Sequence, residues 1–448
     1  MIIFTIMSNF FDTICAIATP IAKGGVGIIR VSGETSKDVV KKFFNKEIIP
    51  NKINHGWIVH NNKKIDEVIV LYFVSPRSFT GEDVVEIQTH GSPVILKEIL
   101  NLLLTNGARL ATKGEFTKRA FLNHKMDLSE AEAVLELIES KSVKSASLNA
   151  SNLSGSLREA IQNMRDEIIE ILAKITASID FPEDVQEVPY ELIEEKLTKI
   201  KEKIENILKG AKSHNILREG IKIAVVGRPN VGKSSLFNAL LNLKRAIVTD
   251  IAGTTRDIIT ESFDINGINA TLTDTAGIRE DNKIDTVEKI GINKAKETIE
   301  DSDIVLLLFD GTIGITKEDE EIFELAKNKK TILISTKQDI NEKTYEGALP
   351  ISSKTGKNIE ELKELIYKNV VDVDIDNIEF TTNQRQQESL QNALIAINNA
   401  LLGTKNKELQ DLISIDIKTA LISLGEITGE VINDEILNSI FDKFCIGK

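Results

Sequence analysis

The segment that most limits how this chain folds is the octapeptide GRPNVGKS at residues 227–234. It fits the pattern G-x-x-x-x-G-K-[ST] and directly follows an apolar run, 221–226, that predicts a strand. Glycines in this pattern let backbone N–H groups surround a β-phosphate, and the N-terminus of the next helix adds positive potential. We therefore expect a phosphate-binding loop, with Lys233 reaching the β- and γ-phosphates and the Ser234 hydroxyl binding Mg²⁺.

Further apolar strands are expected after this loop, at 304–309 and 331–335, with helical segments between them. The alternation predicts a doubly wound, mostly parallel α/β sheet within residues 218–375. Two short motifs resemble the switches of a GTP-hydrolysing domain. They are GTTRD at 253–257, where we choose Thr255 over Thr254 for the Mg²⁺ shell, and DTAG at 274–277.

A base-recognition motif is expected at TKQD, residues 336–339, directly after the strand 331–335. The carboxylate of Asp339 can accept hydrogen bonds from guanine N1–H and its 2-amino group, a pair that adenine lacks. The usual first residue of this motif is Asn, and here it is Thr336. A hydroxyl supports the loop less than an amide does, so we expect weaker base affinity.

The complete set of expected GTP contacts combines the loop, both switches, the base motif and the SSK segment, where such domains contact the base again. It consists of Asn230, Val231, Gly232, Lys233, Ser234, Ser235, Thr249, Asp250, Ile251, Ala252, Gly253, Thr254, Thr255, Asp274, Thr275, Ala276, Gly277, Thr336, Lys337, Gln338, Asp339, Ser352, Ser353 and Lys354.

The residue that positions the attacking water is not obvious, because Ile278 stands where Ras-like enzymes place a glutamine. Glu288 is the best candidate for this role, and a solvated helix glutamate is the competing interpretation. The side-chain oxygen of Asn230, inside the phosphate loop, could bind a monovalent cation. Such a cation could do the electrostatic work of an arginine.

The flanks of this domain differ from each other. Residues 1–125 mix strands, expected at 26–31, 68–74 and 84–88, with a helix at 93–104, which is an α+β pattern. From residue 126 the chain becomes helical, starting at a capping-box spacing of Ser129 with Glu132.

Further helices are expected on both sides of the nucleotide domain. Their ranges are about 157–179, ended by Phe181-Pro182, then 190–213, 384–402 and 408–443. The simplest architecture inserts the domain at 218–375 into one helical domain made of 126–217 and 376–448. Two separate helical domains are the alternative.

Charge and composition limit the partners and the compartment. The net charge of −13 argues against broad non-specific nucleic-acid binding, so an RNA contact must be local or shared with a partner. The 2 cysteines lie far apart, which excludes a disulfide framework and fits a reducing cytoplasm. No run of 18 uncharged apolar residues is present, so we expect no membrane span.

These features, read with both flanks, resemble the MnmE/TrmE family of tRNA modification GTPases over nearly the whole chain, from about Asp12 to Lys448. The stretches that carry the resemblance are ATP at 18–20, GGVGIIR at 24–30, SFTGED at 78–83, Glu86 with HG at 90–91, GEFT at 114–117, RAFLN at 119–123, DIAGTTRD at 250–257 and CIGK at 445–448. The terminal CIGK is the most diagnostic, because generic GTPases do not end this way. Two residues depart from the family pattern: Ser92, where a second glycine is usual, and His124, where glycine or aspartate is commoner.

The resemblance implies a function that the residues alone do not. Family members add a carboxymethylaminomethyl or aminomethyl group to C5 of the wobble uridine of certain tRNAs. They act with a flavin-containing partner, MnmG (GidA), in a heterotetramer or larger complex. A tetrahydrofolate derivative, 5,10-methylene- or 5-formyl-tetrahydrofolate, supplies the one-carbon unit. Members dimerise through the N-terminal domain, and K⁺-dependent pairing of their nucleotide domains triggers hydrolysis.

The resemblance also assigns residues. It implies potassium ligation by Asn230, Thr249, Ile251 and Thr254, and magnesium ligation by Ser234 and Thr255. It implies water positioning by Glu288, and folate contacts by Arg30, Glu86, Lys125 and Lys448.

Cys445 has two interpretations. A lone cysteine is by default a small buried hydrophobe, and the position of Cys445 near a terminus also suits a reactive thiol. The resemblance favours a role in tRNA modification.

Two other functions compete with this one. A ribosome-assembly or regulatory GTPase without modification activity predicts a basic RNA-binding module, which this acidic chain does not show. A folate-dependent one-carbon transferase with an appended regulatory GTPase predicts turnover by the N-terminal domain alone.

Overall fold

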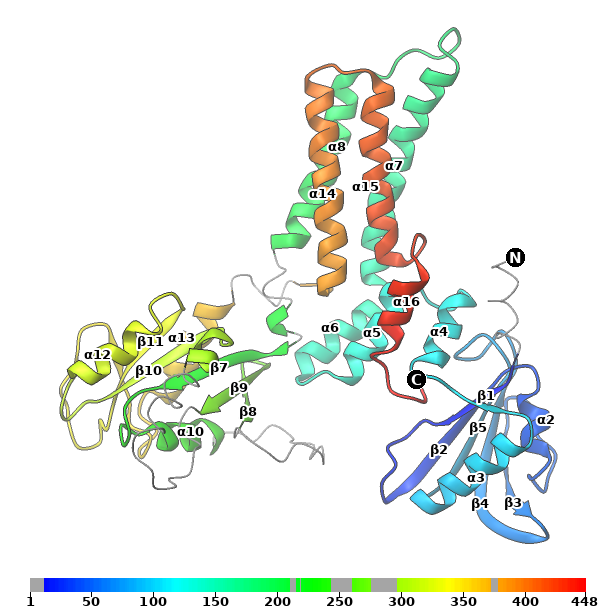
Figure 1. The fold of residues 1–448 in the computed structure, drawn as a ribbon, viewed down its shortest axis with the longest axis horizontal. Helices are drawn as coiled ribbons and strands as arrows, with labels where there is room; N and C mark the ends of the chain where they lie inside the picture. The colour runs from blue at the N-terminus through cyan, green and yellow to red at the C-terminus, as the bar shows by residue number, and fades with distance from the viewer. Residues whose placement is uncertain (1–11, 210–214, 218, 243–259, 275–295, 372–377) are drawn as a thin grey trace. The chain divides into compact units, whose positions relative to one another are not determined.

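A computed structural model of the chain describes residues 12–209, 215–217, 219–242, 260–274, 296–371 and 378–448 (Figure 1). The chain divides into two compact units. One consists of Met1–Leu135, Arg158–Arg165 and Leu421–Lys448, and the other of Glu136–Leu157 and Asp166–Ala420. Among the described residues, no helix combines the length and the apolar character needed to cross a bilayer.

The first unit contains a 6-stranded sheet of order β3-β4-β5-β2-β1-β6, antiparallel except for the pair β1·β6. Its strands are β1 Ile14–Ile17, β2 Gly24–Ser32, β3 Ile53–His60, β4 Lys63–Phe73, β5 Val84–Gly91 and β6 Arg109–Leu110, and its helices are α2 Ser36–Lys41, α3 Pro93–Thr105 and α4 Glu115–Leu122. The predicted strands and helix of residues 1–125 are present, while β1, β3 and β6 were not foreseen.

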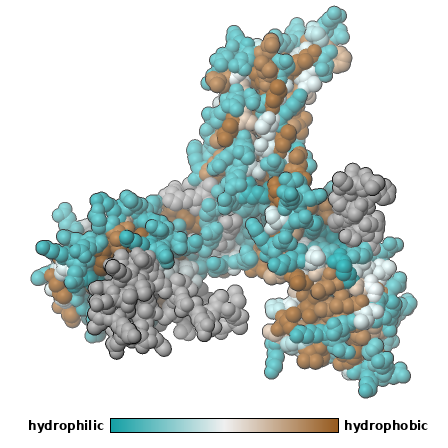
Figure 2. All heavy atoms as spheres, viewed as in Figure 1, coloured by the Kyte–Doolittle hydropathy of each residue, from teal (hydrophilic) through white to brown (hydrophobic). Residues whose placement is uncertain are grey.

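Alternation along these strands separates two faces. On one face Val31, Val85 and Ile87 are fully buried together with Leu96 and Ile99 of α3, and they form the core of this sheet. The opposite face carries Arg30 and Glu86, which are partners in register on β2 and β5. Apolar side chains also remain visible at the surface of this part of the molecule in Figure 2.

The second unit contains a 6-stranded sheet of order β12-β11-β10-β7-β9-β8. All its pairs are parallel except β8·β9. Its strands are β7 Ile221–Val226, β8 Thr260–Ile265, β9 Ile268–Asp274, β10 Ile304–Asp310, β11 Thr331–Thr336 and β12 Ala348–Pro350, and its helices include α10 Lys233–Asn242, α12 Lys317–Glu324 and α13 Ile359–Val370.

Both faces of this second sheet are covered, as the continuous apolar strands predict. Ile223 and Val225 of β7 pack with Leu236 of α10 and Leu362 of α13 in one core cluster. The alternate positions of the same strands pack with Ile322 of α12 in another. The result is the predicted doubly wound α/β fold.

The helical segments are α5 Leu128–Ile138, α6 Val143–Leu153, α7 Ser156–Asp180, α8 Tyr190–Lys209, α14 Gln384–Lys405, α15 Gln410–Thr428 and α16 Asp434–Phe441. Helix α8, which precedes the α/β sheet in sequence, packs against α14, which follows it (Figure 1). Lys203 of α8 also forms a 2.7 Å ion pair with Glu167 of α7. The α/β domain is therefore inserted into an all-α domain.

Two details of the helical prediction were wrong. The single helix expected over 408–443 is two helices, because Gly429 adopts φ 83, a left-handed conformation that ends α15. The capping box is formed by Asp127 and Glu130, not by Ser129 and Glu132. Asp127 Oδ1 accepts the Glu130 N–H at 2.8 Å, and Glu130 Oε2 accepts the Asp127 N–H at 2.8 Å.

Candidate functional site

The carboxyl ends of the parallel strands β7, β10, β11 and β12 lead into the segments expected to bind nucleotide. Ligands of doubly wound sheets bind at this edge, near the point where the strand order reverses. In this sheet the reversal lies beside β7, whose neighbours are β10 and β9. The phosphate loop follows β7, the base motif begins at the end of β11, and the SSK segment follows β12.

The phosphate loop joins β7 to α10 and depends on its first glycine. Gly227 has φ 159, and a Cβ at this position would lie 2.4 Å from the main-chain oxygen of Leu308. Lys233 is buried and donates hydrogen bonds to the main-chain oxygens of Gly227 at 2.7 Å and Arg228 at 2.8 Å. Its ammonium group is therefore held against the loop that would surround the phosphates.

Thr336 connects the base motif to this loop. Its buried hydroxyl lies 2.7 Å from the main-chain oxygen of Val231 and 3.0 Å from that of Phe309, and it can donate to either of them. We expected a hydroxyl to support the loop less than an amide does. In the structure the Thr336 hydroxyl links the phosphate and base segments directly.

The expected base-recognition residues Asp339 and Ser352 are brought together by a direct hydrogen bond. Asp339 is exposed, and its Oδ1 accepts a hydrogen bond from the buried Ser352 hydroxyl at 3.0 Å. Ser353 is half-buried and Lys354 exposed beside it in sequence. Gln338 lies differently, because its amide donates to Ser335 Oγ and to the main-chain oxygen of Lys343.

One residue of this region was missed from the sequence. Asp310 ends β10 opposite Thr336 in register and accepts a 2.6 Å hydrogen bond from Lys337 Nζ. Burial alone would raise the pKa of Asp310, but the bonds from Lys337 and Thr312 outweigh it and hold the pKa below its usual value. The available signal was an aspartate directly after the apolar strand 304–309.

Some of the expected metal-binding and catalytic residues belong to the phosphate loop, and the others lie outside the described residues. Ser234, at the start of α10, and Asn230, with φ 62, are both exposed at the loop. Ser235 follows Ser234 and is exposed, while Val231 is buried and Gly232 half-buried. Residues 249–255, 275–277 and 288, with the remaining expected magnesium, potassium and water-positioning groups, lie outside the described residues, as does the side chain of Asp274.

The N-terminal sheet holds a second cluster. Arg30 donates from Nε at 2.9 Å to Glu86 Oε1 and lies 2.8 Å from it through Nη2. Its guanidinium also lies over the rings of Phe79, at 5.1 Å, and Phe116, at 5.7 Å. An arginine, a carboxylate and two aromatic rings are thus gathered on one side of the sheet.

The C-terminal tail reaches this cluster. The Phe116 N–H donates to the main-chain oxygen of Lys448 at 3.2 Å, and Lys113 forms a β-bridge with Ile446. Burial and the charge of Arg30 lower the pKa of Lys448, and the charge of Glu86 partly offsets them. The structure therefore brings Arg30, Glu86 and Lys448 close to one another.

Two other expected residues belong to the same unit, and Cys445 lies close enough to Lys448 for its charge to act on the lysine. Lys125 donates from Nζ to the main-chain oxygen of Pro76 at 3.0 Å. Cys445 is an exposed free thiol, so it is not the buried cysteine that the default interpretation expects.

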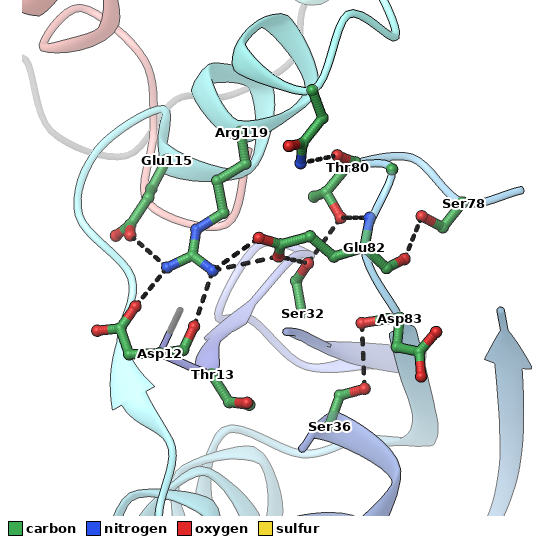
Figure 3. A network of polar contacts seen from close by, with 12 residues as sticks. Asp12, Thr13, Ser32, Ser36, Ser78, Thr80, Glu82, Asp83, Glu115 and Arg119 are labelled. Carbon is green, nitrogen blue, oxygen red and sulfur yellow. Dashed lines mark hydrogen bonds and ion pairs between the residues drawn. The ribbon is translucent and has the colours of Figure 1, made fainter. Parts of the chain in front are cut away.

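A buried polar network underlies the same region (Figure 3). Arg119 is 1% exposed and forms ion pairs with Asp12 at 2.6 Å, Glu82 at 3.1 Å and Glu115 at 3.0 Å. Ser32 of β2 bonds to Glu82 and Thr80. The network fixes the 78–83 loop to α4, and it gives the SFTGED and RAFLN stretches a structural reason to occur together.

Comparison with known proteins identifies this arrangement. The model of the TrmE N-terminus matches residues 13–125, and the model of the MnmE helical domain matches residues 128–445. The tRNA modification GTPase MnmE of Thermotoga petrophila is 42% identical over 451 residues, which cover 98% of this chain and 100% of the relative. The chain belongs to the MnmE/TrmE family.

A second MnmE relative comes from a different bacterium. The tRNA modification GTPase MnmE of Lactococcus lactis subsp. cremoris is 42% identical over 455 residues, covering 99% of this chain and 100% of the relative. The match with the MnmE proteins thus includes the N-terminal sheet, the helices, the inserted GTPase fold and the tail.

Proposed function

We propose that this chain is the GTP-hydrolysing subunit of a complex that adds a carboxymethylaminomethyl or aminomethyl group to C5 of the wobble uridine of tRNA. The observation that carries the proposal is the match of the whole chain to relatives named tRNA modification GTPase MnmE. The intact phosphate loop and base segment add the chemistry that GTP turnover needs.

The proposed GTP and Mg²⁺ site uses residues at the carboxyl edge of the α/β sheet. Lys233 is already held at the loop, and the exposed Ser234 hydroxyl is free to approach a metal at the N-terminus of α10. The exposed carboxylate of Asp339, steadied by Ser352, accepts the paired donors of guanine. GTP would be preferred over ATP for this reason.

Hydrolysis would use a cation where other GTPases use an arginine. Asn230 is exposed in the loop, so its side-chain oxygen can bind K⁺ beside the β- and γ-phosphates, completed by Thr249, Ile251 and Thr254. Thr255 would complete the magnesium shell, and Glu288 would position the attacking water. A K⁺ ion there neutralises charge that develops in the transition state.

The proposed folate site is the Arg30 cluster. A folate carries an anionic glutamate tail and a pterin ring with adjacent donors, which suit the arginine and the carboxylate. Phe79 and Phe116 already stack on the Arg30 guanidinium and supply flat apolar surface. Lys448 adds a second positive group, and Lys125 approaches from the 76–81 segment.

The proposed partners are a second copy of the chain and a flavin-containing protein. The sheet face that carries Arg30 also exposes the apolar side chains of Ile53 (74%) and Val26 (60%), which a partner surface would bury. A homodimer through the N-terminal domain, residues 1–125, would cover them. The helical domain (126–217 with 376–448), the GTPase domain (218–375) and the Cys445 tail would act with a flavin-containing MnmG partner on tRNA in the cytoplasm.

Nucleoside mass spectrometry tests this function. tRNA from cells without the protein should lack C5-substituted wobble uridines, and the wild-type gene should restore them. Cys445→Ser should fail to restore them while keeping GTP hydrolysis, because the exposed thiol lies far from the GTPase segments in sequence. Unchanged nucleosides in the deletion strain would leave a GTPase without modification activity, which is the ribosome-assembly or regulatory alternative.

A further inference from the structure

Arg228 is a basic residue inside the phosphate loop, yet its guanidinium is held by carboxylates of α12. Its Nε donates to Asp319 Oδ1 at 2.8 Å, and its Nη1 lies 3.6 Å from Glu318 Oε2. The side chain of Arg228 is 19% exposed, while that of Asp319 is 0% exposed. The contact between Arg228 Nε and Asp319 Oδ1 is a charge-assisted hydrogen bond, which is roughly twice as strong as one between neutral groups.

Asp319 cannot turn away from Arg228 without breaking the start of its own helix. Its Oδ2 accepts hydrogen bonds from the Thr316 N–H at 3.0 Å and from the Thr316 hydroxyl at 2.8 Å. These bonds are part of the capping box that begins α12. Both oxygens of the carboxylate are therefore used, and the pair attaches the loop to a fixed point.

The other end of the connection is the lysine of the loop. The main-chain oxygen of Arg228 accepts a 2.8 Å hydrogen bond from Lys233 Nζ. A shift of Arg228 would therefore move one of the groups that hold Lys233. The contacts run without interruption from the first turn of α12 through Asp319 and Arg228 to the phosphate-binding ammonium.

We propose that the Arg228–Asp319 pair positions the phosphate loop and sets its affinity for GTP and GDP, and that Arg228 does not contact the reacting phosphates. The pair holds the loop in its binding conformation before the nucleotide arrives, so less ordering is required on binding. Arg228 is thus a positioning residue that acts through the backbone of the loop and through Lys233.

The test compares nucleotide affinity and turnover in the full-length protein. Arg228→Ala should raise the Kd for GDP and the KM for GTP by roughly tenfold or more, with kcat changed less than about twofold. The nucleotide affinity of Arg228→Lys should fall between those of the wild type and Arg228→Ala, since lysine keeps the positive charge and loses the guanidinium geometry. Combining Arg228→Ala with Asp319→Asn should weaken binding no further than the stronger single change.

Two control variants separate this pair from its surroundings. Glu320→Gln removes an exposed carboxylate of the same helix turn and should change the Kd for GDP by less than about twofold. Thr316→Ala weakens the cap of α12 and leaves the Arg228–Asp319 pair in place, so it should weaken GDP binding less than Arg228→Ala does.

Three results would overturn the proposal. A lower kcat at unchanged KM in Arg228→Ala would make Arg228 a residue that acts on the transition state. Additive effects of Arg228→Ala and Asp319→Asn on nucleotide affinity would show that the two residues act independently. Equal losses in Thr316→Ala and Arg228→Ala would trace the effect to the helix as a whole.

Discussion

The hydroxyl of Thr336 lies 2.7 Å from the main-chain oxygen of Val231, so the first residue of the base motif is bonded to the middle of the phosphate loop. The two residues are 105 positions apart in sequence. The base motif and the phosphate loop are thereby joined through a single buried side chain. A substitution in one of them should therefore change ligand binding at the other.

Thr336→Val should weaken binding of GDP, including its phosphates, by about five- to fiftyfold. The substitution keeps the shape but removes the hydroxyl proton that Thr336 can donate to the main-chain oxygen of Val231 or of Phe309, which costs about 1–2 kcal/mol. Thr336→Ser retains the hydroxyl and is the matched control. Fluorescent-GDP titration measures both, and equal affinity in the Val and Ser variants would contradict the link.

Asp339→Asn should exchange GTP preference for xanthosine triphosphate. The carboxylate accepts two donors from guanine, whereas an amide offers a donor to the xanthine 2-oxygen. We expect a loss of GTP affinity of two orders of magnitude or more, since groups built to pair are left unpaired. Competition binding with the two triphosphates measures the change. Unaltered selectivity would remove Asp339 from base recognition.

GTP hydrolysis should be faster in K⁺ than in Na⁺ at equal ionic strength, and Asn230→Ala should abolish most of that difference. The side-chain oxygen of Asn230 is the ligand that selects and holds the ion in our proposal, and a loss of about 10²-fold in kcat is typical for one electrostatic contact. Phosphate release assays in both salts provide the measurement. Equal rates of the wild-type protein in K⁺ and Na⁺ would exclude the cation.

The Arg119 network should make the first unit acid-sensitive through Glu115. Burial opposes ionisation of Glu115, but hydrogen bonds from Arg109, the Thr112 backbone and Arg119 outweigh it and lower its pKa from 4.5 to about 2. A depressed carboxyl pKa stabilises the fold above pH ~4.5 and loses that effect as the pH falls towards ~2. The loss should reach about 3 kcal/mol in the free energy of unfolding.

Fluorescence of the single tryptophan, Trp57, can follow this loss, because Trp57 and Glu115 belong to the same unit. Urea unfolding of the full chain would be repeated between about pH 6 and pH 2 for the wild type and for Glu115→Gln. The variant should be less stable at neutral pH and less dependent on pH. Parallel pH profiles for the two proteins would show that Glu115 does not carry the effect.

Lys448→Met should weaken binding of 5-formyl-tetrahydrofolate by about tenfold or more. The change removes a positive charge beside Arg30 and Glu86 and keeps a side chain of similar length. Lys443→Met, at an exposed position of the same tail, is the control. Calorimetric titration distinguishes them, and equal folate affinity in both variants would remove Lys448 from the proposed site.

The α/β domain could be predicted closely because its signals are local. The strands 221–226, 304–310 and 331–336 bury side chains on both faces of the sheet, so apolar residues predominate in each of them. The phosphate loop likewise depends on glycines and a lysine within one octapeptide. Consistent local signals of this kind identify a strand, a turn and a helix without knowledge of the rest of the chain.

Other features depend on partners far away in sequence. The pairing of Arg119 with Asp12 and Glu82 brings together three segments, and nothing near Arg119 indicates which carboxylates it meets. A glycine such as Gly429 can end a helix, but the apolar residues that follow it continue at helical spacing. The sequence pattern therefore predicted one helix where there are two. The link between Asp310 and Lys337 depends on strand register, which the sequence does not state.

The attachment of residues 438–448 to the first unit has a consequence for synthesis of the protein. Lys118 bonds to Asn438 across 320 positions, and Gly447 fits beneath the main-chain oxygen of Ile17, where a Cβ would lie only 2.4 Å away. A ribosome that stops anywhere between residues 376 and 437 would release a chain with its GTPase domain complete and its N-terminal cluster unfinished. Such truncated products would carry the phosphate loop but lack the contacts that residues 438–448 make with the first unit, so the nucleotide segments are synthesised before the Arg30 cluster can be completed.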